Sequence, residues 1–134
     1  MKKLILLAAL MVPVAAQAQW PKPVEARLTA TYRQCMASGA AALGQTLAMN
    51  VCQSEELERQ DARLNQAYVM VMKRLSPRRK ASLRRSERAW IAQRDRSCKA
   101  AADRYAGGTA APLEFQGCQL RMTIERTLWL ERYR

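Results

Sequence analysis

The sequence predicts an all-α protein, a small antiparallel bundle of three to four helices stapled by two disulfides. Along most of the chain, apolar residues recur at intervals of three, four and seven, which is the spacing of one helix face. No stretch alternates apolar and polar residues as a half-buried strand would. Turns are predicted at Gly39–Gly44, Ser76–Pro77 and Gly107–Gly108. The chain has 134 residues, which is room for one domain of this kind.

The first eighteen residues have the layout of a secretory signal peptide. Two lysines precede an apolar run from Leu4 to Val14, and Ala16 and Ala18 supply small side chains at the cleavage positions. The run is too short to span a membrane. We expect cleavage after Ala18 and a single domain over residues 19–134, periplasmic or secreted. No cysteine adjoins the cleavage position, so we expect no lipid anchor.

The first half of the predicted domain contains one shorter and one longer helix. The shorter helix covers about Val24–Ala37 and ends at the loop between Gly39 and Gly44. The longer helix begins at Thr46, whose hydroxyl can cap free amides of the first turn, and continues to Leu75. Its apolar face consists of Leu57, Leu64, Tyr68, Val71 and Leu75.

Two further helices form the second half. Ser76 caps the third helix and Pro77 takes its first position, where a proline costs no hydrogen bond. This helix extends to about Tyr105, and the fourth begins at Thr109 and Pro112. The apolar face of the third helix consists of Leu83, Trp90, Cys98, Ala101 and Tyr105, and that of the fourth of Leu113, Leu120, Ile124 and Leu128.

The cysteines are Cys35, Cys52, Cys98 and Cys118, an even number that in an exported protein predicts two disulfides. Their spacing is too wide for the paired ligands of a four-thiolate zinc site, so we expect no metal.

The register of the helices favours one pairing of these cysteines. Residues on antiparallel helices face each other when they are equally far from the turn. Cys98 and Cys118 are centred on Gly108, and Cys35 and Cys52 on the first loop, which favours Cys35–Cys52 and Cys98–Cys118. The pairing of Cys52 with Cys98 and Cys35 with Cys118 stays open, although short loops close with a smaller entropy loss.

The chain contains no histidine, which excludes Ser-His-Asp and Cys-His catalysis. A carboxylate pair for glycoside hydrolysis would have to come from the second helix and the helix after it. Such acids are common on helix surfaces, and no row of sugar-binding aromatic residues accompanies them. The candidates are Glu55, Glu56, Glu58, Glu87 and Asp95. We therefore expect no enzyme, no catalytic residue and no cofactor.

Two charged residues interrupt the apolar faces. Asp61 lies between Leu57 and Leu64, and Arg94 lies between Trp90 and Cys98. Both are at similar distances from the turn at Ser76, so we expect them to form a polar clamp that fixes helix register. An acidic group held for catalysis is the alternative interpretation.

The formal net charge is +12, and cleavage of the signal peptide would leave +10. Basic residues are densest at the start of the third helix, at Arg78, Arg79, Lys80, Arg84, Arg85 and Arg88. They are interpreted as a possible face for anionic envelope glycan or lipid, with a solvated surface as the alternative. Trp90 is the sole aromatic among them, so nucleic acid is not the expected partner. The stretch has too thin an apolar face to enter a membrane.

A spaced pattern of residues extends over Cys35–Leu130. Its most specific parts are Leu64-Asn65 followed by Tyr68, and Trp90 followed by Arg94-Asp95 and Cys98. Further positions are Cys52, Asp61, Leu75, Gly107-Gly108-Thr109, Cys118, Thr123, Arg126 and Leu130. This pattern resembles the LprI-type lysozyme inhibitor domain. Ser86-Glu87 departs from the family, in which glutamine more often precedes the tryptophan. The resemblance implies an all-helical, disulfide-linked exported protein of a family whose namesake inhibits lysozyme.

We expect a protein that binds a lysozyme or another cell-wall hydrolase without catalysis. The loops Gly39–Gln45 and Ala106–Pro112 are the candidates for entering a hydrolase cleft. The net charge is an objection, because lysozymes of the common animal type are also basic and like charges repel. The alternatives are an envelope-associated module that binds anionic glycan or lipid, and an immunity or accessory protein for a cell-wall hydrolase.

Overall fold

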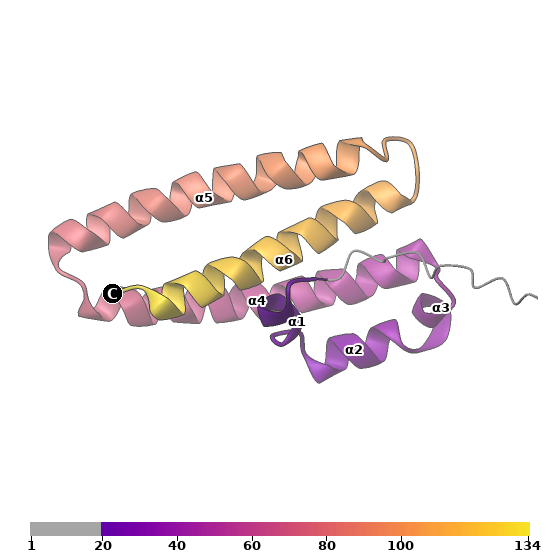
Figure 1. The fold of residues 1–134 in the computed structure, drawn as a ribbon, viewed down its shortest axis with the longest axis horizontal. Coiled ribbons are helices and arrows are strands. Elements are labelled where there is room, and N and C mark those ends of the chain that lie inside the picture. The colour runs from indigo at the N-terminus through magenta and orange to yellow at the C-terminus, as the bar shows by residue number, and fades with distance from the viewer. Residues whose placement is uncertain (1–19) are drawn as a thin grey trace, which may run out of the picture.

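The computed structural model describes residues 20–134, and the predicted signal peptide lies outside them. Within the described part the chain forms only helices, which confirms the all-α class (Figure 1). The helices are α1 (Lys22–Glu25), α2 (Ala30–Met36), α3 (Gly39–Ala42), α4 (Thr46–Arg74), α5 (Pro77–Asp103) and α6 (Ala110–Arg132).

The three long helices, α4 to α6, make up most of the molecule. Consecutive long helices are antiparallel, so α4 and α6 run parallel to each other (Figure 1). Helix α6 lies between the other two and packs on both, whereas α4 and α5 share few contacts despite the short turn that connects them. The last helix in the sequence is therefore the central helix of the fold.

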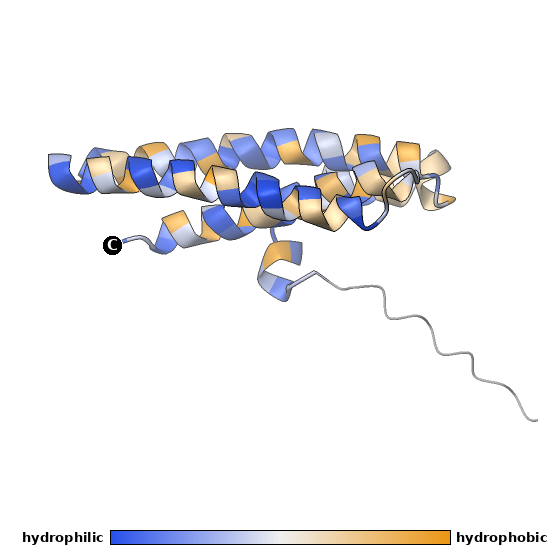
Figure 2. Ribbon diagram, turned by 90° about the horizontal axis from the view of Figure 1, so that it is seen from above, coloured by the Kyte–Doolittle hydropathy of each residue, from blue (hydrophilic) through white to orange (hydrophobic). Residues whose placement is uncertain are grey.

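The apolar interior is divided into two clusters along this central helix. The first joins α1–α3 to α4 and α6, and the second joins the end of α4, the start of α5 and the end of α6. Apolar and polar residues are interspersed along every long helix (Figure 2), so none is uniformly apolar. In the described part of the chain, no helix has both the length and the apolar character needed to cross a membrane.

Both disulfides connect the predicted partners. Cys35 of α2 is bonded to Cys52 of α4, with Cα atoms 5.8 Å apart, and Cys98 of α5 to Cys118 of α6, with Cα atoms 5.3 Å apart. The alternative pairing is therefore wrong. The turn between α5 and α6 includes Gly107, whose positive φ of 81° suits a residue without a side chain.

Four local predictions are wrong. The segment Gly39–Gly44, predicted as a loop, contains the short helix α3, so only Leu43 and Gly44 form the turn before α4. The first helix is broken into α1 and α2, because Thr29 adopts an extended conformation and its hydroxyl accepts a hydrogen bond from the Tyr32 amide at 3.1 Å. Thr46 is the first residue of α4 rather than its cap, which is Gln45. Tyr105 follows the end of α5 and is exposed, so it does not belong to the apolar face of that helix.

Candidate functional site

Charge is segregated along the chain. Residues 34–58 contain no lysine or arginine and three acids, Glu55, Glu56 and Glu58. Residues 62–86 contain eight lysines and arginines and no acid. We call these segments the acidic end and the basic end. About half of each segment belongs to α4, whose 29 residues give a length of about 44 Å.

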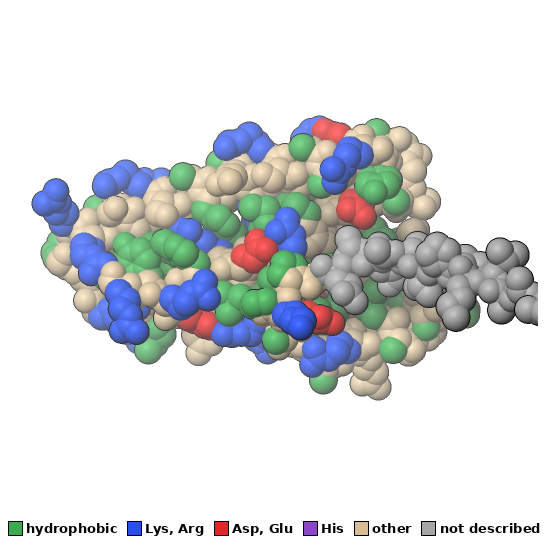
Figure 3. Space-filling view, viewed as in Figure 1, with side chains coloured by type: hydrophobic (Ala, Val, Ile, Leu, Met, Phe, Trp, Pro, Cys, Tyr) green, Lys and Arg blue, Asp and Glu red, His purple; other side chains and the backbone are tan. Residues whose placement is uncertain are grey.

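The acidic end and the basic end also lie in different parts of the structure. Blue lysine and arginine side chains gather over the end of the molecule where α4 meets α5, whereas the corner formed by α3 shows none on the visible face (Figure 3). Lys73 and Arg74, in the last turn of α4, also agree with the helix dipole, which favours cations at the C-terminal end of a helix. The protein is thus a basic molecule in which one segment, residues 34–58, contributes no basic side chain.

The acidic end exposes apolar side chains. Leu43, in the turn between α3 and α4, is 79% exposed, and Leu47 in the first turn of α4 is 77% exposed. Val51, one helical turn after Leu47, is 50% exposed. Single exposed leucines are ordinary, but three large exposed apolar residues within nine positions are a candidate binding surface, which we call the apolar patch.

The patch is supported by a rigid base. Gly44, with a φ of 76°, reverses the chain after Leu43, and the Gly44 and Gln45 amides donate to the carbonyls of Ala41 and Ala40 at 2.9 and 3.0 Å. Cys52, next to Val51, is buried and fixes α4 to α2 through its disulfide. A surface ordered before binding loses less entropy when a partner binds.

Glu56 is a buried anchor that the sequence pattern did not predict. It was grouped with surface acids, but its side chain is fully buried and accepts hydrogen bonds from the Thr29 amide and hydroxyl, from Arg59 and from Gln60. Burial raises the pKa of Glu56, but these hydrogen bonds outweigh it and hold the pKa below its usual value. The spacing of four from Cys52 to Glu56 and again to Gln60 places all three on one face and could have identified it.

The proposed clamp between Asp61 and Arg94 remains a prediction. Their closest atoms, Asp61 Oδ1 and Arg94 Nη1, are 4.0 Å apart, whereas Arg94 is 3.0 Å from the adjacent Asp95. Burial raises the pKa of Asp61, and the positive charge of Arg94 offsets only part of that effect. The prediction assumed that α4 and α5 face each other directly, but α6 lies between them.

A tighter ion pair joins α5 to α6. Arg126 is 2.6 Å from Glu87, donates to the Ser86 hydroxyl at 2.8 Å, and is largely buried. Its guanidinium also lies 3.8 Å from the ring centre of Trp129. Trp90 stacks with both arginines of this region, at 5.7 Å from Arg126 and 5.2 Å from Arg94. This row of alternating cations and aromatic rings holds α5 against α6 at mid-length.

Comparison with known proteins identifies the family of this chain. The family model described as "Lysozyme inhibitor LprI" matches residues 35–130. The chain belongs to this family. A protein of Rhizobium meliloti (strain 1021) described as uncharacterized is 28% identical over 96 residues, which cover 62% of this chain and 69% of the relative. No solved structure matches.

The LprI match contains both disulfides and all three exposed apolar residues of the acidic end. It also contains Glu87, at the position where the sequence departs from the LprI pattern, and the structure pairs this carboxylate with Arg126. Arg126 is itself one of the pattern positions, so the resemblance already contained one half of the α5–α6 ion pair.

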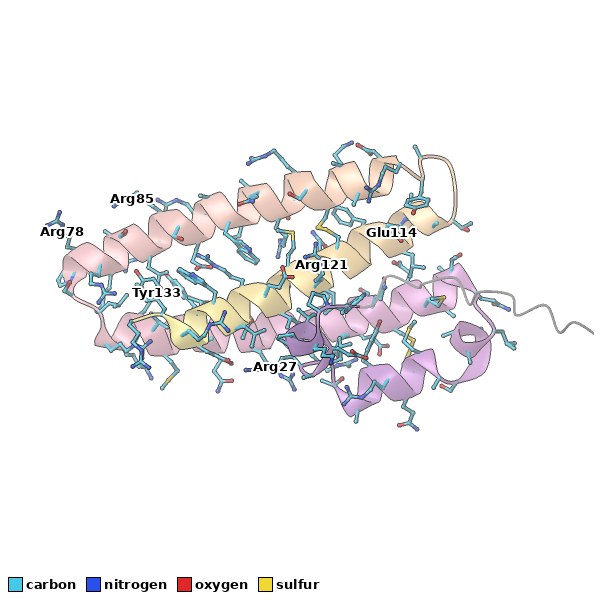
Figure 4. The ribbon with its side chains drawn as sticks, in the orientation of Figure 1. Arg27, Arg78, Arg85, Glu114, Arg121 and Tyr133 are labelled. Atoms are coloured by element: carbon cyan, nitrogen blue, oxygen red, sulfur yellow. A yellow bond between two sulfur atoms is a disulfide. The ribbon has the colours of Figure 1, made fainter. Side chains whose placement is uncertain are left out.

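The predicted basic face of this LprI protein projects mainly into solvent. Arg78 and Arg85 point away from the helices (Figure 4), Arg84 and Arg88 are exposed, and Lys80 is half-buried. Within residues 20–134, none of these five has an acidic side chain within 4.0 Å. The sixth, Arg79, instead donates to the Arg134 carbonyl and lies over the Tyr133 ring. The described residues include no group of three or more His, Cys, Asp or Glu side chains that could hold a metal ion.

Proposed function

We propose that this protein inhibits a lysozyme-type cell-wall hydrolase by docking its acidic end on the substrate cleft. The observation that carries the proposal is the coincidence of exposed Leu43, Leu47 and Val51 with a segment that has no basic residue. Membership in the LprI family supports a lysozyme as the partner. Inhibition would be steric: the patch covers the cleft and excludes the glycan, with no bond made or broken.

The charge segregation answers the objection raised by the net charge. A basic lysozyme would be repelled by the basic end and attracted by Glu55 and Glu58, both of which are exposed at the acidic end. The molecule would therefore approach a basic partner with the apolar patch facing it. Export to the periplasm or outside the cell would place the protein where such hydrolases act.

The apolar patch supplies the affinity in this proposal. Complete burial of one leucine side chain contributes about 1.5–3 kcal/mol. A few such residues at the centre of an interface typically carry most of the binding energy. The loop from Ala106 to Pro112 lies at the same end of the molecule (Figure 1) but offers no comparable apolar cluster, since its flanking Tyr105 is the one large exposed apolar residue there.

The test is a turbidity assay of cell-wall lysis by a basic lysozyme, with and without the purified protein. We expect the wild type to slow lysis and Leu47→Ser to weaken inhibition about four- to tenfold, since half of a leucine burial energy is about 0.8–1.5 kcal/mol. The matched control is Val69→Ser, an exposed apolar residue at the other end of α4, which should inhibit as the wild type does. Equal inhibition by Leu47→Ser and wild type would overturn the proposed docking surface, and absence of inhibition of any lysozyme would overturn the function.

A further inference from the structure

The basic end of α4 carries a second exposed apolar site. Val69 is 48% exposed and Met70 is 59% exposed. They lie between two open grooves. Met70 lines the first, of about 690 Å³, and Val69 lines the second, of about 390 Å³. Lys73, one turn further along, lines both grooves, so these residues form a ridge between them.

Cations flank this ridge on both sides. The first groove is bordered by Arg27, Arg63 and Arg74, and the second by Lys80 and Arg84. The single acid on the first groove, Glu131, is already bound to Arg27 by two hydrogen bonds. No acid lines the second groove, and residues 62–86 contain none.

We infer that this ridge docks on an anionic lipid surface, with Val69 and Met70 entering the headgroup layer and the surrounding cations contacting phosphates. Charge complementarity favours this occupant, because a bilayer with anionic headgroups offers phosphate charge and adjoining apolar volume in one surface. A glycan or a nucleic acid would satisfy the cations but leave the two apolar side chains in water. The apolar residues come from α4, whereas the basic stretch of α5 supplies only cations and so could not enter lipid by itself.

The inference goes beyond the proposed inhibition and does not depend on it. The ridge and the acidic end share no residue, so each surface can be altered by substitution without changing the other.

The experiment is co-sedimentation of the protein, residues 19–134, with two kinds of vesicle. The anionic vesicles contain phosphatidylglycerol and phosphatidylcholine, and the zwitterionic vesicles contain phosphatidylcholine alone. We expect binding to the anionic vesicles and at least tenfold weaker binding to the zwitterionic ones. Val69→Ser with Met70→Gln should weaken binding to the anionic vesicles at least fivefold without changing any charge. The matched control, Leu43→Ser with Leu47→Gln at the acidic end, should bind them as the wild type does.

Two outcomes would overturn the inference. One is absence of binding to the anionic vesicles. The other combines two results: the Val69/Met70 variant binds as the wild type does, and a variant with Lys73, Lys80 and Arg84 replaced by Gln does not bind. That combination would show that the surface binds polyanions by charge alone. Inhibition of lysis, measured on the same variants, separates the two ends: the Val69/Met70 variant should still inhibit, so a failure of either proposal is recognised independently of the other.

Discussion

At the scale of single residues, Glu56 shows how a buried carboxylate can hold two segments together. Thr29, at the start of α2, donates to it through both its amide and its hydroxyl, at 2.9 and 2.5 Å. Gln60 donates to the same carboxylate and also to the Arg27 carbonyl, both within 2.8 Å. The segment between α1 and α2 is thereby fixed on α4, and these short helices in turn support the apolar patch.

The lowered pKa of Glu56 gives a pH dependence with a definite sign. Its stabilisation is complete above the ordinary glutamic acid pKa of about 4.3 and is lost as the pH falls through the lower, folded-state value. We expect Glu56→Gln to reduce the free energy of unfolding by about 2 kcal/mol at neutral pH. The difference from wild type should shrink below about pH 4, because protonation then removes the same charge. Urea unfolding at a series of pH values measures both, and a difference independent of pH would contradict the assignment.

The contrast between Glu56 and Asp61 shows what the sequence could indicate about individual positions. Asp61 was singled out because it interrupts a run of apolar residues, but it is half-exposed and only loosely paired. Glu56 was overlooked because its buried neighbours are Cys52, Gln53 and Gln60, and two of those are polar. A pattern that counts only apolar residues cannot locate a buried face made of polar side chains, since their burial depends on donors that lie far away in the sequence.

At the scale of elements, the helices and disulfides follow from local information, but their packing does not. Ser76-Pro77 and the turn containing Gly107 define where the long helices end, and the midpoints of the cysteine pairs fall on the two turns, so these features were predictable. Which of the long helices pack together depends on how the apolar faces of α4, α5 and α6 fit against one another. Here the second half of α6 carries five buried residues, from Leu120 to Leu130, and α6 takes the central position.

Because α5 packs on α6 and hardly on α4, its attachment depends on few interactions. One is the Cys98–Cys118 disulfide and another is the Glu87–Arg126 pair. We expect replacement of Cys98 and Cys118 by serine to lower stability by about 3 kcal/mol and to speed amide hydrogen exchange in α5 far more than in α4. Replacement of Cys35 and Cys52 is the matched control and should instead affect α2 and α3. Equal acceleration in α4 and α5 in the first variant would contradict the central role of α6.

At the scale of the whole molecule, the net charge does not describe the local charge of the surface that a partner contacts. The formal charge of +12 suggested repulsion from a basic lysozyme, yet the cations are concentrated in residues 62–86 and absent from residues 34–58. The segregation is visible in the sequence, but its consequence is not. Only the structure shows that the two segments occupy opposite ends of α4 and that the acidic one exposes an apolar patch.

The proposed orientation by charge can be tested through association kinetics with a basic lysozyme. Replacing Glu55 and Glu58 by lysine should slow association about tenfold at low ionic strength and leave dissociation nearly unchanged, because exposed charges steer the encounter more than they stabilise the complex. The effect should vanish at about 1 M salt, where charges are screened beyond about 3 Å. Replacing Glu25 and Glu125 by lysine adds the same net charge outside residues 34–58 and should slow association much less. If both pairs of substitutions slow association equally, net charge alone governs the encounter and the acidic end does not orient the molecule.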